Sequence, residues 1–189
     1  SQHYDILVSS SEENDLKLDV EHSFLDPRLD LLGWRFVVKK SISSNLYKGD
    51  ELSYNAYRSC LGVPEGGADY IYGEIYPHEA LIDLLHGISF SKGCYIGQEV
   101  VSRIEHRANI RKRIVPLVSE YPLKQGSSIH LGEQEVGKIG KVYGSRGFSL
   151  LKIELIKKAS NEGIQLISDG RPVRIEIPNW AAFSYSVES

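Results

Sequence analysis

The chain has 189 residues, of which 41% are hydrophobic and 25% are charged, and its formal net charge is −3. This length and composition are typical of an ordinary globular protein with one large domain or two small ones. The negative charge excludes a positive field around the whole molecule that would bind nucleic acid or an anionic membrane. No apolar run approaches the roughly 20 residues of a membrane-spanning helix, so we expect no membrane partner.

Residues 1–109 are predicted to mix strands and helices. Residues 4–8 and 34–38 are rich in aromatic and branched side chains, which favours strands. Asp50 can cap a helix that ends before Gly62. The residues that share one face of this helix, and are expected to face the core, are Leu52, Ala56, Tyr57 and Leu61.

A second helix is predicted between Pro77 and Gly87, because proline favours the first helical position and glycine follows the end of many helices. The apolar residues along one side of it are Leu81, Leu84 and Leu85. Residues 63–76, between the two helices, have the glycine-rich composition of an exposed loop.

Residues 110–189 change to short candidate strands with turn signals about every 8–12 residues, a spacing that favours a barrel or a sandwich. The candidate strands are 113–118, 128–131, 135–142, 148–153, 165–167 and 173–177. Asp169 and Gly170 can form a hairpin turn between the last two. Residues 154–159 are predicted to form a helical turn. We therefore expect two domains, 1–109 and 110–189.

The segment KGCYIGQE, which begins at Lys92, is the strongest candidate for a functional site. Gly93 and Gly97 allow a sharp turn into a helix over 98–107, with unpaired backbone N–H groups at its start. Those groups and Lys92 would lower the pKa of the Cys94 thiol below its free value of about 8.5. A tight turn beside a buried structural cysteine is the alternative interpretation.

Charged residues continue along this predicted helix. Glu99 and Arg103 are four residues apart, so the two side chains can pair. The basic residues that follow are Arg107, Arg111, Lys112 and Arg113. They suit carboxylates or phosphates, or they form a solvated linker.

Three other side chains have structural interpretations. Cys60 is expected in the core, because it sits beside the apolar helix face. His86 and His106 have no partners at metal-ligand spacing, so we expect hydrogen-bonded or solvated imidazoles and no metal site.

KGCYIGQE, with Arg103 four residues after Glu99, resembles the signature of the YgfZ-type folate-binding proteins. These are iron–sulfur cluster assembly or repair factors related to the glycine cleavage T protein, an aminomethyltransferase. The similarity covers most of residues 26–113. The other matching stretches are DPR at 26–28, LGWR at 32–35, YR with GVPEG at 57–66, PHE at 77–79, GISFSK at 87–92 and RKR at 111–113.

The resemblance implies an α+β fold, in which a T-protein-like folate-binding α/β region precedes a small C-terminal antiparallel β-barrel. It also implies tetrahydrofolate as cofactor and a transient contact with iron–sulfur clusters. Cys94 and Lys92 would then carry the chemistry. The residues that would bind the cofactor are Arg58, Gly97, Gln98, Glu99, Arg103 and Arg111.

Two departures from the T protein matter for activity. The aminomethyltransferases lack the cysteine of this signature, and they have a T-G-E-x-G strand where this chain has Gly33 to Phe36. The pterin-binding glutamate of that strand is therefore missing here. Family members also extend well before the position of Ser1, and the chain contains no methionine. We therefore expect a fragment, a processed chain or a missing N-terminal part.

Three functions are compatible with these residues. The first is a tetrahydrofolate-binding factor that supports assembly or repair of iron–sulfur enzymes, including those that modify tRNA. Its partners would be folate and iron–sulfur assembly or client proteins. The second is a folate-dependent one-carbon transferase of the T-protein type. The third is a non-catalytic folate- or RNA-binding module, in which RNA contact through residues 107–113 would be weak.

The cysteines indicate where the protein works. Cys60 and Cys94 form neither a disulfide framework nor a CxxC motif, so a reducing compartment is expected. We predict the bacterial cytoplasm, with the mitochondrial matrix as the alternative.

Overall fold

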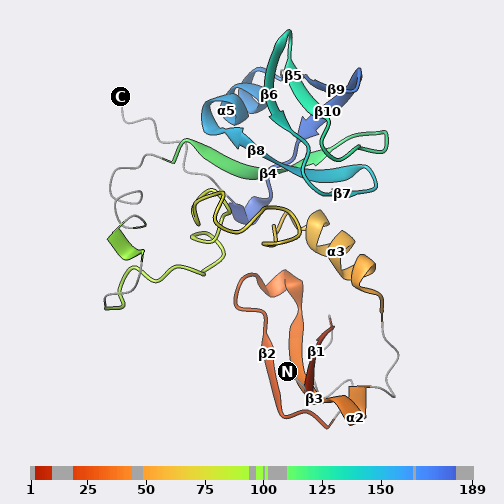
Figure 1. Ribbon diagram of the computed structural model, residues 1–189, viewed down its shortest axis with the longest axis vertical. Helices are drawn as coiled ribbons and strands as arrows, with labels where there is room; N and C mark the ends of the chain where they lie inside the picture. The colour runs from red at the N-terminus through yellow and green to blue at the C-terminus, as the bar shows by residue number, and fades with distance from the viewer. Residues whose placement is uncertain are drawn as a thin grey trace. The chain divides into compact units, whose positions relative to one another are not determined.

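The computed structural model describes residues 3–9, 19–43, 49–93, 97–99, 101, 110–163 and 165–181. The chain forms two compact units, Ser1–Tyr54 and Asn55–Ser189. Figure 1 colours them from red at the N-terminus to blue at the C-terminus. Within the described residues, no helix combines the length and the apolar character needed to cross a membrane.

The first unit contains an antiparallel sheet in the order β1-β3-β2, formed by β1 (Tyr4–Ser9), β2 (His22–Leu25) and β3 (Trp34–Lys39). The predicted strands at 4–8 and 34–38 are thus confirmed, and β2 was not predicted. Phe36 and Val38 of β3 are fully buried. Two short helical turns, η1 (Asp30–Leu32) and α2 (Lys40–Ser43), precede and follow β3.

The first predicted helix is confirmed as α3 (Glu51–Cys60). The Asp50 carboxylate caps it by accepting a hydrogen bond from the Ser53 N–H at 2.5 Å. The predicted buried face is wrong, because Leu52 and Tyr57 are 75% and 47% exposed. The buried residues are polar and also share one helical face: Asn55, Arg58 and Ser59. Polar side chains can face inward here because they find hydrogen-bond partners there.

Cys60 is also exposed, so its predicted place in the core is wrong. It lies at the last residue of α3, on the side of the helix that faces solvent. His86 is exposed as expected, and His106 lies outside the described residues.

The second predicted helix, between Pro77 and Gly87, does not form. Residues 77–86 make a series of hydrogen-bonded turns instead, including Ile82 N–H to Pro77 O at 3.0 Å and Leu85 N–H to Leu81 O at 3.0 Å. Leu81 has φ +64°, outside the helical region. Leu81 and Leu85 are nevertheless buried, so the apolar pattern indicated burial but not helix.

The second unit contains a seven-stranded antiparallel sheet in the order β6-β5-β9-β10-β4-β8-β7. Its strands are β4 (Lys112–Val118), β5 (Ser128–Leu131), β6 (Gln134–Lys138), β7 (Val142–Tyr143), β8 (Arg146–Lys152), β9 (Leu166–Ser168) and β10 (Arg171–Ile175). The predicted strand at 135–142 divides into β6 and β7. The turn at Asp169 and Gly170 is confirmed, with φ of +49° and +71°.

The seven-stranded sheet curls until β6 approaches β8. The Gly140 N–H donates to Phe148 O at 2.6 Å, and Ser149 Oγ donates to Lys138 O at 2.8 Å. Gly137 permits this approach, because a Cβ there would lie 2.6 Å from a methyl carbon of Leu151. The predicted C-terminal β-barrel is therefore confirmed, while the T-protein-like character of the preceding region stays a prediction.

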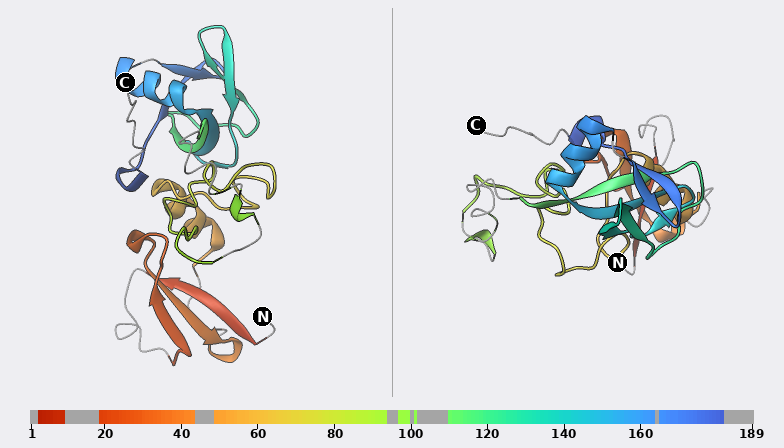
Figure 2. Two further views of the ribbon diagram at one scale, coloured as in Figure 1. Left: turned by 90° about the vertical axis from the view of Figure 1, so that its left-hand side faces the viewer. Right: turned by 90° about the horizontal axis from the view of Figure 1, so that it is seen from above.

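An apolar cluster fills this barrel. Its buried members are Val115, Leu117, Ile129, Ile139, Leu151, Ile156, Leu166 and Val173. Ile156 comes from α5 (Ile153–Glu162), which replaces the helical turn predicted at 154–159. The helix lies against the barrel strands in Figure 2 and contacts β8 and β10. It therefore completes the core that the strands begin.

The C-terminal end of α3 packs on the barrel. Gly62 has φ +71°, and a Cβ at this position would lie 2.3 Å from Pro178 and 2.9 Å from Pro116. The Trp180 side chain, in η2 (Asn179–Ala181), donates to Leu61 O at 2.7 Å. The end of α3 and the barrel therefore belong to one compact unit. The predicted boundary near Asn109 stays a prediction, since residues 102–109 lie outside the described part.

Candidate functional site

The signature segment is described only in part. Cys94 and Arg103 lie outside the described residues, so the predicted thiolate and the Glu99–Arg103 pair stay predictions. Gly97 has φ +87°, and the Val101 N–H donates to Gly97 O at 3.2 Å. Residues 98, 99 and 101 are helical. The predicted sharp turn into a helix is thus confirmed for its first turn.

The described residues of the predicted site lie mostly at the surface. Lys92 and Glu99 are exposed, and Gln98 is half-buried beside them in sequence. Arg111 is exposed just before β4. Their roles in binding stay predictions, and the exposure of Lys92, Glu99 and Arg111 leaves these three accessible to a ligand.

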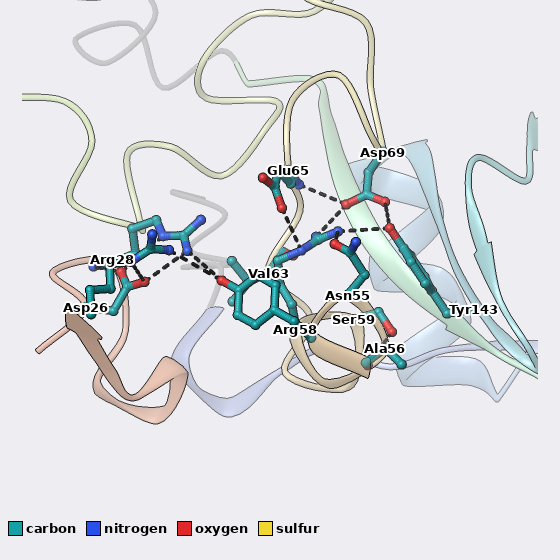
Figure 3. Close-up of polar contacts among 12 residues, drawn as sticks. Asp26, Arg28, Asn55, Ala56, Arg58, Ser59, Val63, Glu65, Asp69 and Tyr143 are labelled. Carbon is teal, nitrogen blue, oxygen red and sulfur yellow. Dashed lines mark hydrogen bonds and ion pairs between the residues drawn. The ribbon is translucent and has the colours of Figure 1, made fainter. Parts of the chain in front are cut away.

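Arg58 has a different environment, because its side chain is fully buried. Nη1 donates to Asp69 Oδ2 at 2.6 Å and to Val63 O at 2.5 Å. Nη2 donates to Asn55 Oδ1 at 3.1 Å and to the Tyr143 hydroxyl at 2.9 Å. Figure 3 shows these contacts from α3, the following loop and β7 around one guanidinium group. Arg58 therefore connects α3 and the loop that follows it to β7, whose Tyr143 lies 85 residues further along the chain.

Two carboxylates surround this guanidinium group. Glu65 Oε2 lies 3.0 Å from Arg58 Nε as an ion pair without hydrogen-bond geometry. Asp69 also accepts from the Glu65 N–H at 2.8 Å and from the Tyr143 hydroxyl at 2.8 Å. Burial and the hydrogen bond to Asp69 raise the pKa of Tyr143 to about 12. The phenol therefore stays protonated at neutral pH and acts as a donor to Asp69.

This network bears on the predicted folate role of Arg58. Direct contact of a ligand carboxylate with the Nη atoms of Arg58 would require Arg58 to release one of Asp69, Asn55, Val63 or Tyr143. The role stays a prediction, and the geometry here fixes the loop that follows α3. Sequence reasoning missed Asp69 and Tyr143. The available signal was that a buried arginine needs a carboxylate, and Asp69 lies in the adjacent glycine-rich loop.

Arg113, in the predicted basic run, is also buried at 6% exposure. Its Nη1 and Nη2 donate to the two oxygens of Asp83 at 2.6 and 2.7 Å, and Nη1 also donates to the carbonyl of His78. This bidentate pair attaches the 77–86 turns to β4. Arg113 is therefore part of the scaffold, whereas Arg111 two residues earlier is exposed.

A second arginine cluster lies in the first unit and was missed as a site. The Asp26 carboxylate is 1% exposed. It accepts from Arg28 Nε at 3.1 Å, Arg28 Nη2 at 3.0 Å and Arg35 Nε at 2.7 Å. Burial alone would raise the pKa of Asp26, but the hydrogen bonds from Arg28 and Arg35 outweigh it and lower the pKa to about 2. These residues come from the DPR and LGWR stretches, which the fold brings together.

Metal-binding residues do not gather in the described part of the chain. There, no group of three histidine, cysteine, aspartate or glutamate side chains is placed to bind a metal ion. Cys94 is outside that part, so its predicted transient contact with a cluster remains open to experiment.

Residues 111–183 match the family described as CAF17, C-terminal beta-barrel domain. This range coincides with the curled sheet of β4 to β10 and α5. The C-terminal part of the chain is therefore similar to this β-barrel domain.

Over a longer stretch, the chain is similar to mitochondrial iron–sulfur cluster assembly factors named IBA57. It is 33% identical to the human protein over 168 residues, which cover 82% of this chain and 46% of that protein. It is 35% identical to the mouse protein over 142 residues, which cover 70% of this chain and 40% of that protein.

A fungal relative is similar over a shorter range. The IBA57 homolog of Neurospora crassa is 45% identical over 100 residues, which cover 51% of this chain and 23% of that protein. The chain therefore spans less than half the length of each of these three relatives.

Proposed function

We propose that this chain is part of a protein that supports the assembly of iron–sulfur enzymes. The single observation behind the proposal is the similarity to human IBA57, an iron–sulfur cluster assembly factor, over 82% of the chain. The match of residues 111–183 to the CAF17 C-terminal barrel agrees with it. The partners would be iron–sulfur assembly or client proteins, as the names of the relatives suggest.

The proposed compartment is the mitochondrion. The human, mouse and Neurospora relatives are all named as mitochondrial. This supports the mitochondrial alternative over the bacterial cytoplasm that we expected first.

At a finer level, we propose that Cys94 acts as a thiolate and that tetrahydrofolate binds close to the signature. Support comes from the KGCYIGQE resemblance, the left-handed Gly97 at a helix start and exposed Lys92 and Arg111. Helix N-termini and neighbouring cations stabilise a thiolate. A role in tRNA-modifying enzymes would follow from the same iron–sulfur function. Nothing in the described part of the chain favours the transferase or the RNA-binding alternative.

The assembly function can be tested in cells depleted of this protein. Activities of mitochondrial iron–sulfur enzymes should fall, while those of mitochondrial enzymes without a cluster should not. Re-expressed wild type and Cys60→Ala should restore them, because Cys60 is distant in sequence from the signature. Cys94→Ala should not. Unchanged iron–sulfur activities on depletion would refute the function, and full rescue by Cys94→Ala would refute only the thiol role.

Folate binding needs a separate experiment. Calorimetry with tetrahydrofolate should give binding to the wild type, weakened roughly tenfold in Arg111→Gln by loss of a charge-assisted hydrogen bond. Arg58→Lys, with its fold checked by circular dichroism, tests whether tetrahydrofolate binding needs the buried guanidinium group of Arg58. Absence of heat with the wild-type chain would reject folate as its ligand.

A further inference from the structure

The Asp26 cluster contains more positive than negative charge. Two guanidinium groups, Arg28 and Arg35, share one carboxylate. In the other arginine ion pairs among the described residues the cation is balanced or outnumbered: Arg113 meets Asp83, Arg146 meets Glu176, and Arg58 meets both Asp69 and Glu65. Within the described part of the chain, this is therefore the ion-pair cluster with an uncompensated cation.

Asp26 has no capacity left for a further donor. Its Oδ1 accepts from the Arg28 N–H at 3.0 Å and from Arg28 Nε at 3.1 Å. Its Oδ2 accepts from Arg28 Nη2 at 3.0 Å and from Arg35 Nε at 2.7 Å. A carboxylate offers about four acceptor positions, and all are used here. Asp26 therefore accepts no further hydrogen bond, and it holds the two arginine side chains in their orientation.

Both arginines also donate to one phenol. Arg28 Nη2 and Arg35 Nη2 lie 3.2 and 3.4 Å from the Tyr54 hydroxyl oxygen. The two guanidinium groups therefore lie side by side, and the Tyr54 hydroxyl proton remains available to a further acceptor. Figure 3 shows the Arg28 side chain against Asp26.

Each arginine keeps unused donors. Nη1 of Arg28 and Nη1 of Arg35 have no acceptor among the described residues. The two side chains are 29% and 23% exposed. Asp26 therefore orients them, while part of each side chain still faces solvent. Paired guanidinium groups with a neighbouring hydroxyl are well suited to an oxyanion with two or more oxygens.

We propose that Arg28, Arg35 and Tyr54 form a binding site for a small oxyanion, a carboxylate or a phosphate group. The ligand bridges the two Nη1 atoms and accepts the Tyr54 proton, and it neutralises the excess charge that Asp26 leaves. The site lies in the first unit, and the proposal does not depend on the iron–sulfur function.

The test uses the full chain at low ionic strength with chloride as the counter-ion. Inorganic phosphate and N-acetylglutamate are titrated separately, and binding is followed by NMR through the arginine Nε–Hε signals and the tyrosine ring signals. We expect at least one probe to shift the signals of Arg28, Arg35 and Tyr54 saturably. The stronger of the two identifies the oxyanion as phosphate or carboxylate. Added sodium chloride should weaken binding, because the charges are partly exposed.

Variants decide whether these residues form the site. Arg28→Gln and Arg35→Gln should each weaken binding at least about tenfold. Arg146→Gln is the matched control, because it makes the same charge change in the balanced exposed pair with Glu176; its affinity should stay within about twofold of wild type. If an arginine variant does not fold, Tyr54→Phe retains every charge and should still weaken binding by several-fold.

The proposal is overturned if neither probe shifts these signals in the wild type. It is also overturned if Arg28→Gln, Arg35→Gln and Tyr54→Phe bind as tightly as Arg146→Gln.

Discussion

Arg58 has no exposed side-chain surface, and its side chain ends in a cationic guanidinium group with five N–H donors. Burying that charge is unfavourable unless an opposite charge and further hydrogen bonds accompany it. Asp69 supplies the charge, and Asn55, Val63 and Tyr143 supply the acceptors. Because each polar group of this network is a hydrogen-bond partner of another, removal of any single partner should lower the free energy of unfolding.

The first prediction concerns Tyr143→Phe. This change removes the hydroxyl that donates to Asp69 and accepts from Arg58, so a buried charge pair loses part of its hydrogen bonding. We expect the free energy of unfolding in urea to fall by about 1–3 kcal/mol.

Tyr121→Phe is the control for this change. Tyr121 is 45% exposed, and its ring lies 4.7 Å from the Arg171 guanidinium carbon, a contact that phenylalanine retains. Its effect should stay within about 0.5 kcal/mol. Equal effects of the two variants would contradict the structural role of the Tyr143 hydroxyl.

The second prediction concerns pH and Asp26. Hydrogen bonds from Arg28 and Arg35 overcome burial and lower the pKa of Asp26 from 3.8 to about 2 in the folded chain. Its contribution to stability is therefore present above about pH 4 and is lost as the pH falls towards 2. The difference in unfolding free energy between wild type and Asp26→Asn should shrink over that interval. A difference that stays constant from pH 6 to pH 2 would contradict it.

At the scale of elements, the joint between α3 and the barrel depends on Gly62. Two requirements coincide at this residue: a left-handed backbone and the absence of a side chain against Pro178 and Pro116. Either requirement favours glycine. Together they exclude every other residue unless the backbone moves.

The third prediction separates these requirements. Gly62→Ala should lower the unfolding free energy by about 2–4 kcal/mol, because it adds backbone strain and a steric clash. Gly144→Ala has nearly the same φ, +67°, with nothing within 4 Å of its Cβ, so it should cost only about 1 kcal/mol. Urea denaturation of both variants measures the difference. Equal losses of unfolding free energy in the two variants would show that Pro178 and Pro116 move to accommodate the added Cβ.

How well the elements could be predicted depends on the range of the interactions that form them. The barrel strands and the Asp169–Gly170 turn follow from alternation and local turn chemistry, so the sequence was sufficient. The 77–86 helix failed because Leu81 takes a left-handed conformation, and local pattern does not report the packing that imposes it. The buried face of α3 was missed for a related reason. Its Arg58 faces inward because Asp69 and Tyr143, outside the helix, accept its hydrogen bonds.

In the candidate site, too, local features could be predicted and long-range contacts could not. A sharp turn at Gly97 follows from glycine chemistry and was predicted, whereas the contact of Arg58 with Asp69 was not foreseen; its contact with a ligand stays a prediction. The Asp26 cluster could not be foreseen from spacing alone. It requires Arg28 and Arg35 to meet beside the Tyr54 hydroxyl, which depends on the long-range β2–β3 pairing.

At the scale of the whole molecule, the two units have unequal cores. The second unit has an eight-residue buried apolar cluster in the barrel. Among the described residues of the first, the buried apolar ones are Leu32, Phe36 and Val38. Small domains bury a smaller fraction of their surface and are correspondingly marginal in stability.

The fourth prediction follows from this inequality. Backbone amides of β4 and β8 should exchange with deuterium at least about tenfold more slowly than those of β1 and β3, because local opening costs less where less apolar surface is buried. Hydrogen-exchange mass spectrometry of the full chain measures both in one sample. Equal protection would mean that the two units open together.

The hydrogen bond between Tyr143 and Arg58 joins a barrel strand to a helix 85 residues earlier in the chain. The family match begins only at residue 111. A gene segment cut at that point would carry Tyr143, Pro116 and Pro178 into a new protein without the helix end that covers them. We therefore expect the segment that recombination can exchange as one unit to begin before α3. That segment is longer than residues 111–183, which match the family model.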